Sequence, residues 1–331
     1  MKVAVNGFGR IGRIFTRIAL EQNEFEIVAI NDLASVSTLA HLFKYDSVHG
    51  RFNGTVETTE SELILNGKAI KVYSEPNPEN LNWTGIDLLL EASGRFRKLE
   101  EAQLHIHAGA RRVLLSAPPK SPEIGQYVMG LNHTQLTNNE LIFSNASCTT
   151  NSCAHIVKLI DDSWGIENGF LTTVHAYTSD QRIHDAPHSD LRRARAAANS
   201  IIPTSTGAAK AIIKLFPHLE GRFQGNAARV PVLDGSFTDL TLLLRNPASV
   251  EEINACIKLA TENELNGIVE YTTEPLVSTD IIGNNHSGVF DSSLTESFGK
   301  LVKLITWYDN EFGYSARLVD LVKYYLTNVL K

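Results

Sequence analysis

The chain opens with apolar and polar positions that switch from a strand pattern to a helical pattern and back. A short apolar run at 2–6 leads into a glycine-rich turn, after which Ile14 and Ile18 mark the buried side of a helix over 13–22. A second apolar run at 25–30 closes a strand–helix–strand unit of about thirty residues, the length that such a unit needs. The helical crossover predicts that the two strands are parallel.

Further strand patterns extend this unit into an open α/β sheet. Apolar runs at 86–92 and 112–116 flank a helical pattern at 99–108, an alternation typical of a parallel sheet with helices on its faces. Three alternating segments precede them, at 52–57, 62–66 and 68–73. Asn66-Gly67 lies between the last two segments and favours a hairpin turn, so we expect an antiparallel insertion in the sheet.

From Cys148 onward the pattern changes to long strands with fewer helices between them. Helices are expected at 148–163, 206–215 and 250–262, and strands at 170–177, 226–232, 238–245 and 302–308. This change predicts an α/β domain over 1–147 and an α+β domain with a mixed or antiparallel sheet over 148–314. Residues 315–331 carry apolar side chains at helical spacing, and we expect this helix to complete the first domain.

Composition narrows the classes of function. The 331 residues include 30 Lys and Arg against 37 Asp and Glu, a net charge of -7 that argues against a broad electrostatic grip on nucleic acid or an anionic membrane. No apolar run approaches the roughly 18 residues that a membrane helix needs, and no signal pattern precedes the first strand. Three cysteines cannot build a disulfide scaffold, so we expect a cytoplasmic protein. One of them, Cys256, lies in a predicted amphipathic helix and is expected in the core.

A glycine-rich motif occupies the first turn. Segment 7–12 reads GFGRIG and fits the pattern G-x-G-x-x-G, and it follows a strand and opens a helix. Its glycines are Gly7, Gly9 and Gly12. They let backbone N–H groups, chiefly those of Arg10 and Ile11, approach a pyrophosphate at the positive end of the helix dipole. The first domain is therefore expected to be a Rossmann dinucleotide-binding domain.

Asp32 distinguishes between two dinucleotides. It ends the second strand about twenty residues beyond Gly12, where a carboxylate accepts hydrogen bonds from both ribose hydroxyls and repels a 2′-phosphate. This arrangement favours NAD over NADP. Glycine-rich turns and strand-end carboxylates also occur in other α/β proteins, and Arg10 could form only a surface salt bridge. All of these features together in one unit favour the nucleotide site.

Cys148 stands where a polar stretch meets an apolar helical pattern, at the expected start of a helix. A helix N-terminus lowers a thiol pKa, and a nearby imidazole turns such a thiol into a nucleophile. His175 ends a strand pattern in the same domain and is the imidazole that we expect beside Cys148. Taken alone, a cysteine is more often a small buried apolar residue and a histidine a hydrogen-bonded structural one.

A zinc site is the alternative for this segment. Cys148, Cys153 and His155 lie close in sequence, but their spacing is not that of a structural zinc site and a fourth ligand is missing. His105 and His107 add only a surface-like alternation. We therefore expect no metal, and we expect Cys153 to pack in the interior or to serve as an occasional oxidation partner.

Taken together, the motifs resemble those of phosphorylating glyceraldehyde-3-phosphate dehydrogenase. The matching segments span the chain: NGFGRIGR at 6–13, NASCTTN at 145–151, VHAYT at 174–178, DLRRARAAA at 190–198, IPTSTGAAK at 202–210, RVP at 229–231 and WYDNE at 307–311. These segments are far more specific than a glycine-rich turn alone. The resemblance implies an NAD-dependent enzyme of glycolysis or gluconeogenesis with a Rossmann domain and a catalytic domain.

The chemistry of that family gives roles to the thiol and the imidazole. The resemblance implies that the Cys148 thiolate attacks the aldehyde of D-glyceraldehyde 3-phosphate and that the hemithioacetal passes hydride to the nicotinamide. Inorganic phosphate would then release 1,3-bisphosphoglycerate from the thioacyl enzyme. His175 would polarise the thiol and act as base for the hemithioacetal hydroxyl. The oxygen would take hydrogen bonds from the Cys148 backbone N–H and the imidazole.

Two anions must be held near the thiol, the substrate phosphate and the attacking phosphate. By resemblance, the substrate phosphate is assigned to Thr178 and Arg229, with Asp180 and Arg195 nearby. By resemblance, the inorganic phosphate region is assigned to Ser147, Thr149, Thr206 and Gly207. Asn310 should orient the nicotinamide carboxamide, and Ser116 is also assigned to the cofactor. The alternatives are helix capping for the hydroxyls and a surface ion pair for Arg229.

The sequence departs from the family pattern at several positions. Pro76 stands where the family commonly carries an arginine near the adenine, so one contact to NAD is missing. Ser152 takes the place of the more usual cysteine after Asn151, and His155 replaces a proline. His184 and Phe312 replace a usual leucine and tryptophan. The first of these lies in a loop expected to line a neighbouring subunit's cofactor site in the homotetramer that the resemblance implies.

Two other functions compete with this interpretation. Erythrose-4-phosphate dehydrogenase would share the thiol chemistry, but segments 176–180 and 206–209 look like the glyceraldehyde enzyme. A catalytically silent NAD-binding regulatory or adhesion protein could have lost the thiol, the imidazole or the phosphate arginine, and all three are present. The expected partners are glyceraldehyde 3-phosphate, inorganic phosphate and further copies of the chain, with no nucleic acid and no membrane.

Overall fold

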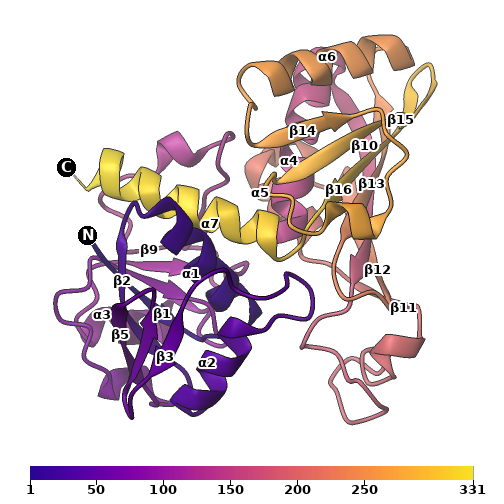
Figure 1. Cartoon of the computed structure of the whole chain (residues 1–331). Coiled ribbons are helices and arrows are strands. Elements are labelled where there is room, and N and C mark those ends of the chain that lie inside the picture. Colours follow the sequence, from indigo (N-terminus) through magenta and orange to yellow (C-terminus); the bar gives the residue numbers. More distant parts are fainter. Residues whose placement is uncertain (331) are drawn as a thin grey trace. The chain divides into compact units, whose positions relative to one another are not determined.

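The computed structural model describes residues 1–330, and the chain forms two compact units (Figure 1). The first unit is Met1–Ala146 together with the C-terminal segment that begins at Ser315. The second unit is Ser147–Tyr314. The predicted boundary, between residues 147 and 148, lies one residue later. The C-terminal segment therefore belongs to the same compact unit as the N-terminus.

The first unit is built on a sheet whose strand order is β3-β4-β5-β2-β1-β6-β7-β9-β8. The strands are β1 (Lys2–Asn6), β2 (Glu26–Asn31), β3 (Val56–Thr58), β4 (Glu62–Leu65), β5 (Lys68–Tyr73), β6 (Leu88–Glu91), β7 (Val113–Leu115), β8 (Gly125–Gln126) and β9 (Ile142–Ser144). The strands β3, β4 and β5 pair antiparallel, as the hairpin dipeptide predicted. Central strand β1 pairs in parallel with β2 on one side and with β6 on the other. The chain order thus reverses between β1 and β6, and open α/β sheets bind ligands beside the carboxyl ends of strands at such a reversal.

Helices of the first unit follow the strands that they connect. They are α1 (Arg10–Gln22), α2 (Val36–Lys44) and α3 (Leu99–His107), with short 3-10 turns at Pro78–Asn80 and His133–Gln135. The C-terminal helix α7 (Phe312–Tyr324) continues into a π-helical turn at Tyr325–Val329, and Figure 1 shows it in yellow beside the indigo and purple elements of the first unit. Tyr325 packs against Phe143 of β9, with ring centroids 5.3 Å apart. Within residues 1–330, no helix is both long enough and apolar enough to span a bilayer.

The second unit is built on a mixed sheet whose strand order is β11-β12-β10-β13-β16-β15-β14. The strands are β10 (Ile166–Ala176), β11 (Ile202–Ser205), β12 (Phe223–Val230), β13 (Ser236–Leu244), β14 (Val269–Thr272), β15 (Gly288–Phe298) and β16 (Leu301–Tyr308). The helices are α4 (Cys148–Trp164), α5 (Ala208–Leu215) and α6 (Val250–Glu262), with 3-10 turns at Ala197–Asn199, Pro217–Leu219 and Ser278–Ile281. β10 pairs parallel with β12 and antiparallel with β13. The predicted α/β class, with a Rossmann domain and an α+β domain on a mixed sheet, is confirmed.

Strand β10 shows how this sheet positions side chains. Leu171, Thr173 and His175 are buried, whereas Phe170, the residue before Leu171, is 61% exposed. Successive side chains of a strand point to opposite faces, so the buried set shares one face of the sheet. His175 thus lies on the covered face, and Thr172 lies on the opposite one.

Several elements have no counterpart among the sequence predictions. The elements missed are α2, β8, β9, β11, β14 and β15. Helix α2 is nine residues long and buries only Leu39, Ala40 and Phe43, which gives a weak periodic signal. Strand β15 is long, but it buries polar residues such as Asp291 and Ser292 beside apolar ones, so its sequence does not alternate. Burial of hydrogen-bonded polar groups removes the pattern by which a strand is recognised.

One prediction about the core is wrong. Cys256 was expected to be buried in α6, but its side chain is only partly covered, with Sγ 3.6 Å from Ser163 Oγ. The buried stripe of α6 is formed by Ile253, Ile257 and Ala260. Cys256 lies one position before Ile257, which places it at the margin of that stripe.

Candidate active site

Cys148 is the first residue of α4. Ser147 is the N-cap, and its Oγ accepts a hydrogen bond from the Thr150 backbone N–H at 3.0 Å. The preceding residue, Ala146, has a φ of 56°, in the left-handed region that non-glycine residues rarely adopt. The cap and the strained turn fix where the helix starts, and the helix dipole favours a negative charge at Cys148.

Strand register brings an imidazole and a guanidinium to this thiol. His175 Nε2 lies 3.5 Å from Cys148 Sγ. His175 is opposite Arg229 in the parallel pairing of β10 with β12, and Arg229 Nη1 lies 2.6 Å from His175 Nδ1. The carbonyl oxygen of Ala176 lies 2.7 Å from the same Nδ1 and accepts a hydrogen bond from Arg229 Nη1 at 3.0 Å. Three residues predicted from distant segments therefore lie together.

The surroundings shift the ionisation of both partners. Burial raises the pKa of the Cys148 thiol, although the Arg229 charge and the hydrogen bond with Thr149 lower it in part. Burial and the Arg229 charge lower the pKa of His175 to about 3, although the contact with Ala176 opposes this shift. Both groups are therefore neutral near pH 7. Arg229 can only donate, and in the tautomer that carries its proton on Nδ1 the hydrogen bond of Arg229 goes to the Ala176 carbonyl oxygen, which also accepts from Nδ1–H. In this tautomer Nε2 presents a lone pair to the thiol and can accept its proton.

Tyr308 supports this pair, although no role was predicted for it. Its hydroxyl lies 2.9 Å from Thr149 Oγ1 and 2.9 Å from Thr173 Oγ1. Its ring meets the His175 ring in a T-shaped contact with centroids 5.9 Å apart. Tyr308 therefore ties the first turn of α4 to the strand that carries the imidazole. The sequence signal for it was its place in the WYDNE segment.

A buried carboxyl near the thiol was also missed. Burial and the negative charges of Asp309 and Glu311 raise the pKa of Asp234 to about 9. Asp309 in turn accepts hydrogen bonds from the backbone N–H groups of Gly283 and Glu311. Asp234 is therefore protonated near pH 7. A negative charge on Asp234 would raise the pKa of Cys148, so its protonation keeps that charge from opposing the thiolate.

The guanidinium that pairs with Asp180 belongs to a residue for which no role was predicted. Arg193, rather than Arg195, forms the ion pair with Asp180. Partial burial disfavours the Asp180 carboxylate, but the hydrogen bond and charge of Arg193 outweigh this effect and lower its pKa. Arg195 pairs instead with Asp185 at 2.9 Å, where both side chains are exposed. Thr178 lies two residues beyond the end of β10 and is half-buried.

Residues assigned to inorganic phosphate lie at two helix starts. Ser147 caps α4, and Thr206 Oγ1 accepts a hydrogen bond from the Ala208 backbone N–H at 3.2 Å, where α5 begins. Gly207 is the N-cap residue of α5. Thr149 is buried and bonded to Tyr308. The capping contacts that formed the alternative interpretation are present, and the phosphate role of these residues stays a prediction.

Asn310 is linked to the backbone next to His175. Its Oδ1 accepts a hydrogen bond from Ser236 Oγ at 2.6 Å. The same Ser236 Oγ accepts one from the Ala176 backbone N–H at 3.1 Å. Because Oδ1 is engaged, the Nδ2 amine is the end of this side chain that can donate to another group.

Cys153 and His155 make contacts inside α4. Cys153 Sγ lies 3.1 Å from the Thr149 carbonyl oxygen, and burial raises the pKa of this thiol far above its usual range. His155 Nδ1 lies 3.2 Å from the Asn151 carbonyl oxygen. Both side chains are buried, in keeping with the predicted packing role of Cys153.

The first unit holds a cavity of about 270 Å³ at the carboxyl ends of β1 and β2. Its lining includes Gly7, Gly9, Asp32, Pro76, Ser93 and Arg95. Pro76, where an arginine was expected from the family, shares this cavity with Arg95. Arg95 was not singled out from the sequence. The Arg95 guanidinium thus places a positive charge at the cavity that Pro76 lines, where the family commonly carries an arginine.

The glycines of the motif are required by close contacts. Gly7 has a φ of 93°, and a Cβ atom on it would lie 2.5 Å from the Ser93 backbone nitrogen. A Cβ atom on Gly12 would lie 2.3 Å from the Gly7 carbonyl oxygen, whereas one on Gly9 would meet open space. Gly9 is the N-cap of α1 and supplies no side-chain cap. The N-terminus of α1 therefore offers backbone N–H groups beside open space, which fits a pyrophosphate.

Asp32 is held next to this turn. Its Oδ2 accepts a hydrogen bond from the Phe8 backbone N–H at 2.8 Å, and its Oδ1 accepts one from Ala34 at 3.0 Å. The Arg10 side chain forms the alternative salt bridge, with Nη1 2.6 Å from Asp46 Oδ2. The backbone of Arg10 and Ile11 stays the predicted contact. Ser116 follows β7, and its backbone N–H donates to the Glu91 carbonyl oxygen at 3.0 Å.

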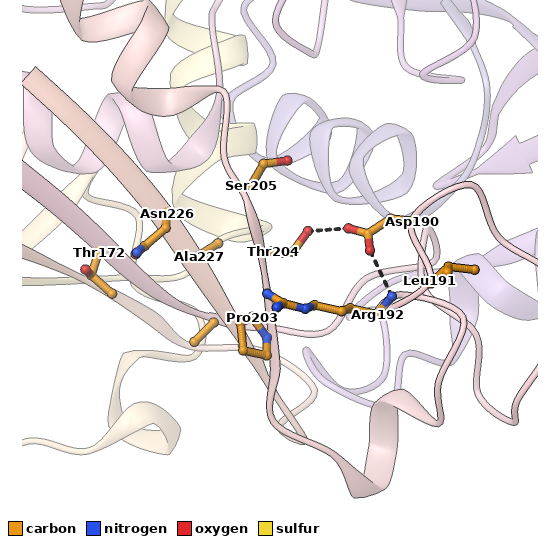
Figure 2. Close-up of a pocket in the computed structure, with 10 residues that line it drawn as sticks. Thr172, Asp190, Leu191, Arg192, Pro203, Thr204, Ser205, Asn226 and Ala227 are labelled. Atoms are coloured by element: carbon orange, nitrogen blue, oxygen red, sulfur yellow. Dashed lines mark hydrogen bonds between the residues drawn. The ribbon is translucent and has the colours of Figure 1, made fainter.

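A larger cavity in the second unit lies on the other face of the sheet from the thiol. It measures about 720 Å³ and is lined by Thr172, Asp190, Leu191, Pro203, Ser205 and Asn226, among others (Figure 2). Thr172 and His175 are on opposite faces of β10. Asp190 accepts hydrogen bonds from the Thr204 hydroxyl at 2.8 Å and from the Arg192 backbone N–H at 2.9 Å. Size alone would therefore have pointed away from the chemistry.

A Rossmann unit with a cavity at its glycine turn, and a second unit with a thiol beside an imidazole, fit the class of nicotinamide-dependent oxidoreductases. Residues 1–99 match the NAD binding domain of glyceraldehyde 3-phosphate dehydrogenase, and residues 147–310 match the C-terminal domain of that enzyme. The chain therefore belongs to the glyceraldehyde-3-phosphate dehydrogenase family, as the resemblance predicted. It is an NAD-dependent oxidoreductase that acts on an aldehyde.

Full-length relatives carry the same family name. The chain is 54% identical to the glyceraldehyde-3-phosphate dehydrogenase of Thermotoga maritima over 327 residues, which cover 97% of this chain and 98% of the relative. It is 51% identical to that of Geobacillus stearothermophilus over 328 residues, which cover 98% of both chains. It is 51% identical to that of Streptomyces coelicolor over 327 residues, which cover 97% of both.

Proposed function

We propose that this chain oxidises D-glyceraldehyde 3-phosphate with NAD and inorganic phosphate to give 1,3-bisphosphoglycerate, through a thioester on Cys148. The observation that carries this proposal is the position of His175 Nε2, 3.5 Å from Cys148 Sγ, with Arg229 beside the same ring. A thiol with a base beside it can add to an aldehyde, and a neighbouring guanidinium can bind the phosphate of the substrate.

The residues of the second unit divide the chemistry between them. His175 Nε2 takes the thiol proton as Cys148 Sγ bonds to the aldehyde carbon, and the new oxyanion takes hydrogen bonds from the Cys148 backbone N–H and from Nε2–H. Nε2–H then gives this proton to the oxyanion to form the hemithioacetal hydroxyl, and the neutral imidazole takes it back as the carbonyl forms. Bound NAD supplies the acceptor for the hydride. A phosphate oxygen then attacks the thioester carbon, and the Cys148 thiolate leaves.

Cationic and hydroxyl groups around the thiol suit two phosphates. We assign the substrate phosphate to Arg229 and Thr178, with the Asp180–Arg193 pair holding the neighbouring loop. We assign inorganic phosphate to the two helix starts, where the groups are Ser147, Thr149, Thr206 and Gly207. A dianion on Arg229 would offset the positive charge that lowers the pKa of His175, and this would make the imidazole a stronger base.

The cavity of the first unit suits the dinucleotide. The pyrophosphate is assigned to the backbone at Gly9, Arg10 and Ile11, and the ribose hydroxyls to Asp32. Asn310 would donate from Nδ2 to the nicotinamide carboxamide. Arg95 is a cation near the adenine end that Pro76 leaves without its usual arginine. We also propose that the protein is cytoplasmic.

The assay follows NADH absorbance with D-glyceraldehyde 3-phosphate and with erythrose 4-phosphate, each with and without inorganic phosphate. We expect phosphate-dependent turnover with the triose, lost in Cys148→Ser and kept in Cys256→Ser, which alters a partly exposed cysteine outside the site. Preference for the tetrose, or activity indifferent to phosphate, would overturn the substrate or the phosphate step. NAD binding without turnover would support a regulatory protein instead.

A further inference from the structure

A buried carboxylate is the hub of a hydrogen-bond network in the first unit. Glu91 ends β6 and is 2% exposed. Its Oε2 accepts hydrogen bonds from Asn6 Nδ2 at 2.5 Å and from His105 Nε2 at 3.1 Å. Its Oε1 accepts from the Ser93 backbone N–H at 2.8 Å and from the Ser93 hydroxyl. A carboxylate with four donors is fully satisfied, so the network has one defined arrangement.

Trp83 fixes the tautomer of His105. The indole N–H lies 3.2 Å from His105 Nδ1, and an indole nitrogen can only donate. Nδ1 therefore carries a lone pair, and the ring proton is on Nε2, directed at Glu91. Trp83 and His105 are both completely buried. The imidazole is thus a fixed donor to the carboxylate.

From Glu91 the network runs across the carboxyl ends of three strands. Asn6, at the end of β1, accepts at Oδ1 a hydrogen bond from Asn31 Nδ2 at 2.7 Å, and Asn31 ends β2. The Asn31 carboxamide then bonds both backbone groups of Glu75, each at 2.9 Å. The bond between Asn6 and Glu91 joins β1 to β6, the pair between which the chain order reverses.

Four residues held by this network also line the 270 Å³ cavity. They are Asn6, Asn31, Glu75 and Ser93. Ser93 also packs closely against Gly7. A Cβ atom on Gly7 would lie only 2.5 Å from the Ser93 backbone nitrogen. A shift of Ser93 would therefore displace the first glycine of the turn. Neither Glu91 nor His105 is in the lining of that cavity.

We propose that Glu91 and His105 are positioning residues for the dinucleotide. They hold four residues of the cavity lining in place without lining the cavity themselves. The affinity for NAD therefore depends on a buried histidine of α3. This proposal rests on the proposed function in one respect, that the 270 Å³ cavity is the NAD site. The thiol chemistry of the second unit does not depend on the network.

Two variants break the network and one preserves it. Glu91→Gln keeps the shape of the side chain but replaces one accepting oxygen with an amide NH2 group that faces other donors. His105→Leu removes the imidazole N–H that donates to Glu91. His105→Gln offers an amide N–H in a similar place. We expect the Kd for NAD to rise about tenfold in the first two variants, the effect of leaving one buried group unpaired. In His105→Gln it should stay within about threefold, which corresponds to less than half that free energy.

Other measurements separate positioning from loss of stability. The rate at which iodoacetamide alkylates Cys148 without NAD, and kcat at saturating NAD, should stay near wild type in all three variants. Ile142→Val removes a methyl group from the buried apolar cluster that also contains Trp83, and it leaves the network intact. It should lower the melting temperature without weakening NAD binding. Asp32→Ala, a change in the cavity lining, reports directly on the cofactor site.

The outcomes are distinct. The proposal is overturned if Glu91→Gln and His105→Leu bind NAD as tightly as wild type while Asp32→Ala does not. It is also overturned if Ile142→Val weakens NAD binding as much as the two breaking variants do when it lowers the melting temperature equally. A third contradicting result is that His105→Gln binds NAD as weakly as His105→Leu. If Asp32→Ala itself binds NAD normally, the cavity is not the cofactor site and the proposal fails with that assignment. Weak NAD binding in the two breaking variants, restored by His105→Gln, supports it.

Discussion

At the scale of single residues, the site depends on how Arg229 is shared. Its Nη1 contacts both His175 Nδ1 and the Ala176 carbonyl oxygen, so one cation sets the charge around the imidazole and the thiol. Its positive charge lowers the pKa of Cys148 and also lowers the pKa of His175. Arg229 therefore favours the thiolate but disfavours the protonated base. A bound phosphate changes this balance.

The first prediction concerns the ionisation of Cys148. Burial raises the pKa of its thiol, so at a given pH the thiolate fraction is smaller than for an ordinary cysteine. The alkylation rate with iodoacetamide should therefore keep rising with pH beyond about 8.5, where a model thiol is half ionised. Arg229→Gln removes a charge that lowers this pKa, so its profile should move to still higher pH. Arg222→Gln, at an exposed site in the same unit, should leave the profile unchanged, and a profile with a midpoint below 8 in the free enzyme would contradict this account.

A second prediction distinguishes two arginines. The resemblance assigned both Asp180 and Arg195 to the surroundings of the substrate phosphate. Asp180 forms its ion pair with Arg193, whereas Arg195 pairs with Asp185. Arg193→Gln should raise the KM for the aldehyde substrate about tenfold, since it releases Asp180 and the loop near the thiol. Arg195→Gln breaks an exposed pair and should change KM less than about twofold. Steady-state kinetics at saturating NAD measures both, and a larger effect of Arg195→Gln than of Arg193→Gln would contradict this expectation.

The candidate pair Cys148 and His175 was predictable from the sequence, whereas the residues that contact this pair were not. Cys148 and His175 were predictable because a helix start and a strand end carry recognisable patterns. Tyr308 and Asp234 act through contacts between segments far apart in the chain, Tyr308 with Thr149 and Thr173 for example. No local pattern encodes such contacts, so they became visible only in the folded unit.

At the scale of elements, local signals determined how well each could be predicted. Helix α6 was predicted with its observed bounds, 250–262, because Ser249 and Glu252 form a capping box at its start. Helix α5 begins two residues later than predicted, because Thr206 and Gly207 form its cap instead of its first turn. Strand β15 was missed because its buried polar residues depend on partners elsewhere in the sheet.

A third prediction uses two glycines of the nucleotide turn. A Cβ atom on Gly12 would collide with the Gly7 carbonyl oxygen at 2.3 Å, so Gly12→Ala should lower the free energy of unfolding by about 1–3 kcal/mol and also weaken NAD binding. A Cβ atom on Gly9 meets open space next to the cavity. Gly9→Ala should therefore weaken NAD binding about tenfold or more with little change in stability, because the methyl group takes the place of the pyrophosphate.

Denaturant unfolding and NAD titration of both variants provide the test. Gly50→Ala is the matched control, a glycine in the same unit with open space around its Cβ position but outside the cavity lining. Gly50 has a φ of 72°, so this control should cost some stability without affecting NAD. Normal NAD affinity in Gly9→Ala would show that the pyrophosphate does not lie at this turn.

At the scale of the whole molecule, the second unit carries apolar side chains on its surface. Phe170, Leu191 and Ile201 are 61%, 81% and 70% exposed. Phe170 and the 720 Å³ cavity are on the face of β10 opposite to His175. Exposed apolar groups of this size are typical of a protein interface. The homotetramer that the family resemblance implies would place these side chains in a subunit interface.

A fourth prediction follows for the assembly. Light scattering on the purified protein should give the mass of four chains. Phe170→Asp places a charge on the exposed sheet face and should shift the protein to smaller species with an unchanged far-UV circular dichroism spectrum. Glu167→Asp, on the same strand, keeps its charge and should not change the mass. A monomeric wild-type protein at assay concentration would contradict the predicted homotetramer.

The most direct test of the account is to trap the acyl group on Cys148. The enzyme is mixed with NAD and D-glyceraldehyde 3-phosphate without inorganic phosphate, quenched in acid, digested and analysed by mass spectrometry. Cys148 and Cys153 lie on the same peptide, so fragment ions are used to locate the adduct. We predict a phosphoglyceroyl thioester on Cys148, none on Cys153 or Cys256 above background, and its loss on adding phosphate before the quench. NADH formation with no adduct on Cys148, or an adduct that phosphate does not release, would contradict the thioester mechanism.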